Sequence, residues 1–173
     1  MNYAELKPYD IANGPGVRVS LFVSGCTHHC KGCFNKEAWD FNYGKPFDDS
    51  VMDHILTLLE PSYIKGITYL GGEPLDPNNQ PGLLRLSRKI KERFPDKSIW
   101  CFTGYVLEDH ILAKKLGPWE VTSELLTYLD VLVDGPFVEE KKNLRLRFRG
   151  SENQRLLDMK KTLACGQAVL WEE

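Results

Sequence analysis

Four short apolar runs recur along the chain, and each of them ends in a glycine. The runs cover residues 19–25, 66–72, 98–104 and 131–135. Runs that are apolar throughout are typical of strands buried on both faces of a parallel sheet. Apolar residues also recur at helical spacing over residues 51–59 and 83–94. Strands that alternate with helices predict right-handed β/α units.

Residues 143–150 show a different pattern, in which apolar and basic side chains alternate. Leu144, Leu146 and Phe148 would lie on one face of a strand, and Arg145, Arg147 and Arg149 on the other. One interpretation is a solvated surface strand, because charged runs usually face water. The other is that these arginines, with Arg155, hold the carboxylate of a cofactor or the acidic surface of a partner.

The length of the chain limits the fold. We expect residues 1–173 to form a single α/β domain, in which residues 156–173 are a less certain C-terminal extension. A complete eight-unit barrel takes about 250 residues, so the repeated units predict an incomplete, laterally open (β/α) barrel. An open side would admit a large substrate, including a loop of another protein. In such folds the chemistry gathers at the carboxyl ends of the strands.

Charge and hydropathy exclude some classes of function. The chain has 22 basic and 24 acidic residues, which gives no general reason to expect nucleic-acid binding. The first ten residues are polar and lack the apolar core of a signal peptide, and no apolar run approaches the roughly 18 residues that span a membrane. We therefore expect a cytoplasmic protein that binds neither nucleic acid nor a membrane.

Three of the five cysteines fall within eight residues, directly after the first apolar run. Cys26, Cys30 and Cys33 supply three thiolates from one loop, whereas a 4Fe-4S cluster normally takes four. Three ligands would leave one iron open to an external group. The alternatives are a zinc site completed by His28, His29 or a distant cysteine, or three free thiols. Cys101 and Cys165 are isolated and are interpreted as ordinary free cysteines.

A second motif, Gly71-Gly72-Glu73-Pro74, ends the second apolar run. Alone it indicates only a tight turn. Downstream of the cysteine motif it is more specific, because the glycines allow close approach of the backbone and Glu73 offers an acceptor for an ammonium group. Asp134 ends another run, where it would either contact a cofactor or cap a loop.

The cysteine spacing and the glycine motif together resemble the radical S-adenosylmethionine superfamily. The resemblance implies a 4Fe-4S cluster whose open iron binds the methionine part of S-adenosylmethionine, and an ammonium group that Glu73 accepts. The sequence departs from this superfamily at Gly32, because members often have an aromatic residue just before the third cysteine. In this chain the aromatic residue, Phe34, follows that cysteine. The predicted cofactor contacts are Gly32, Cys33, Phe34, Gly71, Gly72, Glu73 and Asp134.

Further motifs narrow the resemblance to the family of activating proteins of anaerobic ribonucleoside-triphosphate reductase. They lie at residues 10–16, 21–26, 32–35, 100–105, 131–135 and 149–154. The resemblance implies an activase that installs a glycyl radical on the reductase and takes its electron from a donor such as flavodoxin. The alternatives are an activase of another glycyl-radical enzyme such as formate acetyltransferase, a small deazaguanine-forming radical enzyme, an iron-sulfur electron carrier or a zinc adaptor.

Overall fold

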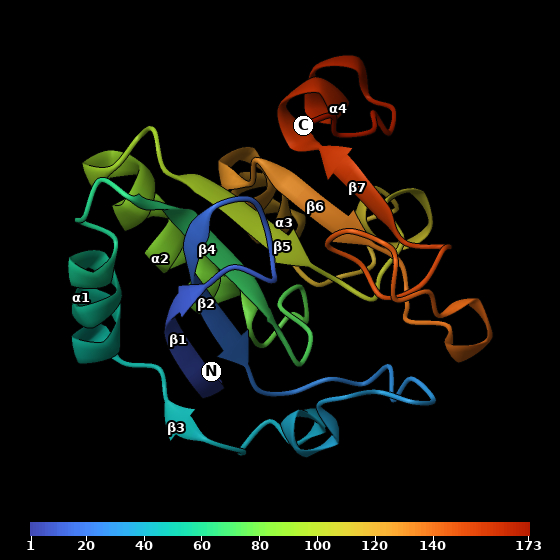
Figure 1. The fold of residues 1–173 in the computed structure, drawn as a ribbon, viewed down its shortest axis with the longest axis horizontal. Coiled ribbons are helices and arrows are strands. Elements are labelled where there is room, and N and C mark those ends of the chain that lie inside the picture. Colours follow the sequence, from blue (N-terminus) through green and yellow to red (C-terminus); the bar gives the residue numbers. More distant parts are fainter.

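The computed structural model describes residues 1–173 and arranges them around one open sheet of seven strands (Figure 1). The strands lie in the order β3-β1-β2-β4-β5-β6-β7, so β3 and β7 form the two edges. Their bounds are β1 Asn2–Asp10, β2 Val17–Val23, β3 Lys45–Pro46, β4 Ile64–Gly71, β5 Ser98–Phe102, β6 Val131–Asp134 and β7 Arg155–Asp158.

The centre of the sheet is parallel, as the four apolar runs predict. β2, β4, β5 and β6 are parallel neighbours, and the register places Val23 of β2 beside Gly71 of β4. Parallel neighbours require crossover connections, and these contain helices, which lie behind the sheet or at its left in Figure 1. The α-helices are α1 Asp49–Leu58, α2 Gln80–Arg93, α3 Trp119–Tyr128 and α4 Met159–Cys165, and the shorter helical segments are η1 Lys36–Trp39, η2 Leu107–Ile111 and η3 Glu139–Lys141. The helices expected over 51–59 and 83–94 are confirmed as α1 and α2.

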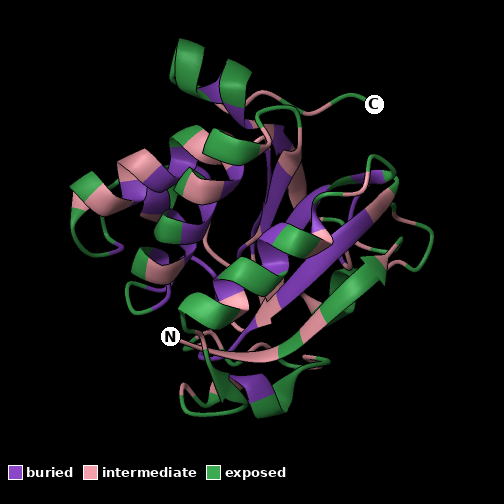
Figure 2. Cartoon of the chain, turned by 90° about the vertical axis from the view of Figure 1, so that its left-hand side faces the viewer, coloured by how far each residue is buried: buried purple, intermediate pink, exposed green.

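The edges of the sheet correct the expectation of a wholly parallel arrangement. β1 pairs antiparallel with β2 and β3, and β7 pairs antiparallel with β6. Figure 2 shows β1 as a largely exposed or half-buried strand beside buried neighbours. An edge strand with a solvated face needs no continuous apolar run, so the hydrophobic pattern did not reveal these strands. The α/β class is confirmed, and the sheet is mixed and unclosed.

The main core lies between the sheet and the helices and contains 26 buried residues, among them Leu21, Ile67 and Leu132. A smaller apolar cluster covers the opposite face of the sheet. There Trp100 packs edge-on against Phe148 and Trp171, with ring centroids 5.4 and 4.9 Å apart. Both faces of the central strands are therefore buried, which explains their continuous apolar character.

A buried arginine ties the turn at residues 11–16 to the central strands. The guanidinium of Arg18 donates to the hydroxyls of Thr68 and Ser98 and to the carbonyls of Ile67 and Ser98. The Thr68 hydroxyl in turn donates to the carbonyl of Asn13. Burial lowers the pKa of Arg18 to about 10, so the side chain is still charged near neutral pH. These hydrogen bonds hold the turn against the sheet, so its role in the structure is to support the fold.

The strand expected over residues 143–150 is wrong, because this segment forms a turn-rich loop. The amide of Asn143 donates to the carbonyl of Gly150 and the amide of Leu146 donates to the carbonyl of Asn143, so the segment folds back on itself. Phe148 adopts a left-handed φ of 61°, which no strand tolerates. The alternation of apolar and basic residues therefore does not correspond to two strand faces.

The last part of the chain returns to the sheet. Leu157 of β7 and Met159 of α4 are fully buried in the main core. Beyond α4, Leu170 forms a β-bridge with Leu157, and the amide of Trp171 donates to the carbonyl of Leu156. No helix in the structure has the length and apolarity needed to cross a membrane.

Candidate functional site

A pocket of about 200 Å³ opens where the parallel strands end. Segments that follow β2, β4, β5 and β6 all line it, as expected for a site at the carboxyl ends of parallel strands. The lining includes all three cysteines of the clustered motif together with Gly71, Gly72 and Glu73. The structure therefore brings together the two motifs that lie 38 residues apart in the chain.

The cysteines lie on a loop that leaves β2 and returns through η1. The amide of Gly25 donates to the carbonyl of Ala38 over 2.7 Å, and that of Cys26 donates to the carbonyl of Trp39 over 3.1 Å. The imidazole of His29 stacks on the indole of Trp39 with centroids 4.2 Å apart. These contacts hold both ends of the loop, so its thiols face a defined cavity.

The donor set fits an iron-sulfur cluster, because thiolates are the usual ligands of such clusters and three cysteines line one pocket. No three histidine, cysteine or acidic side chains converge closely enough to ligate one metal ion. Thiolates of a cluster bind different irons, so the sulfurs of Cys26, Cys30 and Cys33, which all line the pocket, need not converge on one point. Trp39 also lines the pocket, and its indole Nε1 is a buried donor without a protein acceptor.

Burial changes the acidity of two of these thiols. It raises the pKa of Cys26 to about 11 and also raises the pKa of Cys30. Both thiols are therefore protonated at neutral pH until a cation binds. Coordination by Cys26 or Cys30 would release a proton.

The glycine motif packs directly against the cysteine loop. The amide of Gly72 donates to the carbonyl of Val23, and that of Glu73 donates to the carbonyl of Gly25. A Cβ atom on Gly72 would lie 2.6 Å from the Gly25 carbonyl oxygen, and Gly71 has a left-handed φ of 102°. Glycine is needed at position 72 because the two loops touch there through their backbones, and at position 71 because of the left-handed φ and the close backbone of β2.

The carboxylate of Glu73 is buried, with 1% of the residue exposed, and four protein donors surround it. Oε1 accepts from the amide of Leu75 and the hydroxyl of Thr103, at 2.9 and 2.7 Å. Oε2 accepts from the amide of Gly104 at 2.7 Å and from His28. Glu73 thus joins the loops after β2, β4 and β5.

His28 is a site residue that the sequence reasoning considered only as a zinc ligand. Its Nε2 lies 2.8 Å from Oε2 of Glu73, and its ring packs edge-on against Tyr105 with centroids 4.4 Å apart. It also lies against Gly104, where an added Cβ would come within 2.7 Å of the imidazole. Only its place between two cysteines hinted at this role.

Gly32 and Phe34 flank the third cysteine outside the pocket lining. Gly32 has a left-handed φ of 77° and lies beside the side chain of Glu139. The side chain of Phe34 is exposed, and its ring lies 5.8 Å from that of Phe137, which does line the pocket.

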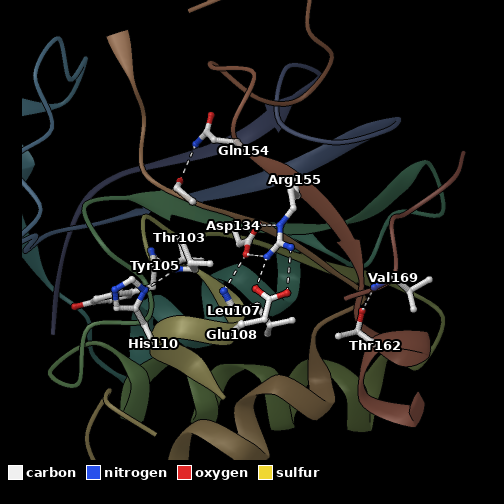
Figure 3. Close-up of polar contacts among 12 residues, drawn as sticks. Thr103, Tyr105, Leu107, Glu108, His110, Asp134, Gln154, Arg155, Thr162 and Val169 are labelled. Carbon is white, nitrogen blue, oxygen red and sulfur yellow. Dashed lines mark hydrogen bonds and ion pairs between the residues drawn. The ribbon is translucent and has the colours of Figure 1, made fainter. Parts of the chain in front are cut away.

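Asp134 is buried and is engaged by neighbouring residues of the protein, as Figure 3 shows. It accepts from the amide of Leu107 at 2.9 Å and from Arg155 at 2.6 and 3.0 Å. Arg155 also pairs with Glu108, and this hydrogen bond lowers the pKa of the Glu108 carboxyl. Of the two roles considered for Asp134, these contacts are those of a loop cap.

The predicted arginine face is therefore dispersed. Arg155 lies on β7 and binds Asp134. Arg147 pairs with Glu173, and Arg149 donates to the carbonyl of Gln154. Arg145 is exposed and makes no ion pair in the structure. None of the four lines the pocket.

Comparisons with known proteins agree with this site. Residues 12–157 match the family described as "4Fe-4S single cluster domain". The chain is 44% identical over 156 residues to the anaerobic ribonucleoside-triphosphate reductase-activating protein of Pasteurella multocida, covering 89% of this chain and 95% of that protein. The protein of the same name from Escherichia coli K12 is also 44% identical, with 89% and 96% covered. The one from Enterobacteria phage T4 is 42% identical, with 90% and 93% covered.

Proposed function

We propose that this chain activates an anaerobic ribonucleoside-triphosphate reductase. The chain belongs to the 4Fe-4S single-cluster family and to the family of anaerobic ribonucleoside-triphosphate reductase-activating proteins. The activation is the installation of a glycyl radical on the reductase. The protein is an iron-sulfur enzyme, and its cofactors in the proposal are a 4Fe-4S cluster with an open iron and S-adenosylmethionine.

The observation that carries the proposal is the shared pocket. Cys26, Cys30 and Cys33 line it together with the turn from Gly71 to Glu73, so a cluster and a ligand of its open iron would occupy one cavity. Three thiolates leave one iron of a cluster without a protein ligand. When bound, the reduced cluster supplies the electron that cleaves S-adenosylmethionine to methionine and a 5'-deoxyadenosyl radical.

The residues of this chain bind and orient these groups. The three thiolates hold the cluster, and the backbone at Gly71 and Gly72 permits a ligand to approach closely. Because four protein donors already surround the Glu73 carboxylate, its role in the proposal is twofold. It holds the loops in register, and its buried charge favours a nearby ammonium group.

The open sheet supports the choice of substrate. Its edges, β3 and β7, are not joined, which agrees with the incomplete barrel of radical S-adenosylmethionine enzymes as the proposed fold type. A glycine on a protein loop must come within contact distance of the reacting carbon, and an unclosed sheet leaves room for such a loop. A redox protein such as flavodoxin is the proposed electron donor.

The test is anaerobic mixing of the reconstituted protein, S-adenosylmethionine and dithionite with the anaerobic reductase of the same organism. We expect about four irons per chain, formation of 5'-deoxyadenosine and a doublet in the electron paramagnetic resonance spectrum of the reductase. Deoxyadenosine without the doublet would indicate a different protein substrate, and formate acetyltransferase is the first to try. Iron binding without deoxyadenosine would indicate an electron carrier.

A further inference from the structure

A surface of exposed apolar and basic side chains lies beside the pocket. Leu144 is 88% exposed and Phe34 is 73% exposed, the former more than any other large apolar residue of the chain. Lys141, Lys142 and Arg145 lie within three residues of Leu144 in the sequence and are also exposed. We call these five residues the rim surface. None of the five lines the pocket, although the resemblance predicted Phe34 as a cofactor contact.

The rim surface is continuous with the pocket. Phe137 lines the pocket, its ring lies 5.8 Å from that of Phe34, and Lys142 Nζ lies 5.1 Å from the centre of the Phe34 ring. Lys31 of the cysteine loop pairs with Glu139 and Glu140 at 3.8 and 3.9 Å. These contacts place the loop that carries Leu144 against the outer side of the cysteine loop, and a protein that reaches the pocket from this side would meet the rim surface.

The loop is ordered by its own hydrogen bonds. Asn143 accepts from the amide of Arg145 at 2.9 Å and donates its side-chain amide to Glu152 at 3.1 Å. Lys142 forms a β-bridge with Ser151, and Phe148 packs on Trp100. Leu144 is therefore held outward by an ordered backbone. Exposed apolar groups on an ordered loop suit a partner surface, because little conformational entropy is lost on binding.

The charge of the loop is distinctive. Residues 139–149 contain five basic and two acidic side chains, although the whole chain has more acidic than basic residues. Arg147 and Arg149 are engaged within the protein, and the two glutamates are partly neutralised by Lys31. Lys141, Lys142 and Arg145 form no ion pair, so their positive charge is available to a partner. Charge of this kind steers an acidic surface toward the site.

We infer that the protein substrate binds to the rim surface, and this inference rests on the proposed function. The partner it fits presents acidic side chains around a small apolar depression that receives Leu144, beside the loop that enters the pocket. The apolar contact would contribute affinity, and the cations would set the orientation and the rate of association.

The test compares two double variants of the full-length protein, both reconstituted with iron and sulfide. The first, Leu144→Asp with Arg145→Glu, changes the rim surface. The second, Ile11→Asp with Lys65→Glu, makes the same change of charge at exposed residues near the amino ends of the parallel strands. The half-saturating concentration of reductase is measured by the glycyl-radical doublet, with dithionite as reductant, and association is measured separately by biolayer interferometry.

We expect the rim variant to need at least about tenfold more reductase, and the control variant to match the unchanged protein. Deoxyadenosine formation in the absence of reductase should be the same in all three proteins. Equal half-saturation for the rim variant would overturn the inference. A defect seen only when flavodoxin replaces dithionite would also overturn it, because the surface would then bind the electron donor. If the unchanged protein produces no doublet, the proposed function itself fails.

Discussion

The imidazole Nε2 of His28 lies 2.8 Å from Oε2 of Glu73, and this contact connects the cysteine loop to the glycine motif. The Glu73 carboxylate is buried and also binds Thr103 and Gly104, so His28 is the one side chain through which the cysteine loop reaches it. The contact fixes the position of the proposed cluster ligands relative to the proposed S-adenosylmethionine site.

Replacing His28 by alanine should impair the reaction while leaving the cluster in place. A hydrogen bond to a charged group contributes about 1.5–3 kcal/mol, so we expect at least about a tenfold lower kcat/KM for deoxyadenosine formation with unchanged iron content. His28→Gln, which retains a donor, should recover part of the loss. Amide hydrogen exchange over residues 26–33 of the cluster-free protein should be faster in His28→Ala. Unchanged kinetics and exchange in that variant would contradict a positioning role.

The cysteines allow a direct test of cluster ligation. Cys26→Ala, Cys30→Ala and Cys33→Ala should each abolish cluster assembly, because each removes one of three thiolates from the pocket. Cys165→Ala provides the matched control, since that thiol is exposed and lies on α4. Iron and sulfide content and the visible absorption of the cluster are the measurements. A full cluster in any of the first three variants would contradict the assignment of that cysteine as a cluster ligand.

Gly72→Ala should destabilise the protein by about 1–3 kcal/mol, as overpacking typically does. The added Cβ would meet the Gly25 carbonyl at 2.6 Å and the Ala38 carbonyl at 3.0 Å, and neither backbone can move without shifting the cysteine loop. Gly82→Ala within α2 is the control, because an added Cβ would meet only side-chain atoms of Met1 and Phe47, at 3.3 Å or more, and the substitution gains helix propensity. Urea unfolding of the cluster-free proteins measures both changes, and equal stability of the two variants would refute the packing argument.

Arg18→Met should lower the free energy of unfolding by about 3 kcal/mol. The substitution fills a similar volume but leaves the carbonyls of Ile67 and Ser98 buried without their donor. Arg85→Met on the surface of α2 is the control, because that side chain is half exposed and its ion pair with Asp49 is solvated. Thermal unfolding of both variants distinguishes them, and a similar small effect in each would argue against a structural network at Arg18.

The Arg155–Glu108 pair should make a small contribution to stability that depends on pH. Its hydrogen bond lowers the pKa of the Glu108 carboxyl in the folded protein, so this contribution is fully present above the ordinary glutamate pKa and is lost as the pH falls through the lowered value. Glu108→Gln should therefore be less stable than the unchanged protein at pH 7, with the difference vanishing in acid. Because Glu108 is half exposed, solvent screening keeps the effect within about 1 kcal/mol. A difference that grows below pH 4 in urea titrations would contradict this sign.

The hydrophobic pattern was sufficient for the centre of the fold. Strands buried on both faces require continuous apolar runs, so β2, β4, β5 and β6 were visible in the sequence, and so were α1 and α2. The pattern failed at the edges, where β1 has a solvated face, and in residues 143–150, where alternation reflects a loop and not a strand. The hydrophobic pattern of a sequence reflects which positions are buried. In these segments the buried positions follow no regular period.

The sequence by itself determined the chemistry of the site, because the spacing of Cys26, Cys30 and Cys33 and the two glycines of the second motif are local properties of the chain. Only the tertiary structure decided which groups meet there. His28 and Glu73 are 45 residues apart, and the contact between them exists because β2 and β4 are parallel neighbours whose carboxyl ends coincide. Asp134 also ends a parallel strand, but it does not line the pocket, and its carboxylate accepts hydrogen bonds from Arg155 and from the amide of Leu107.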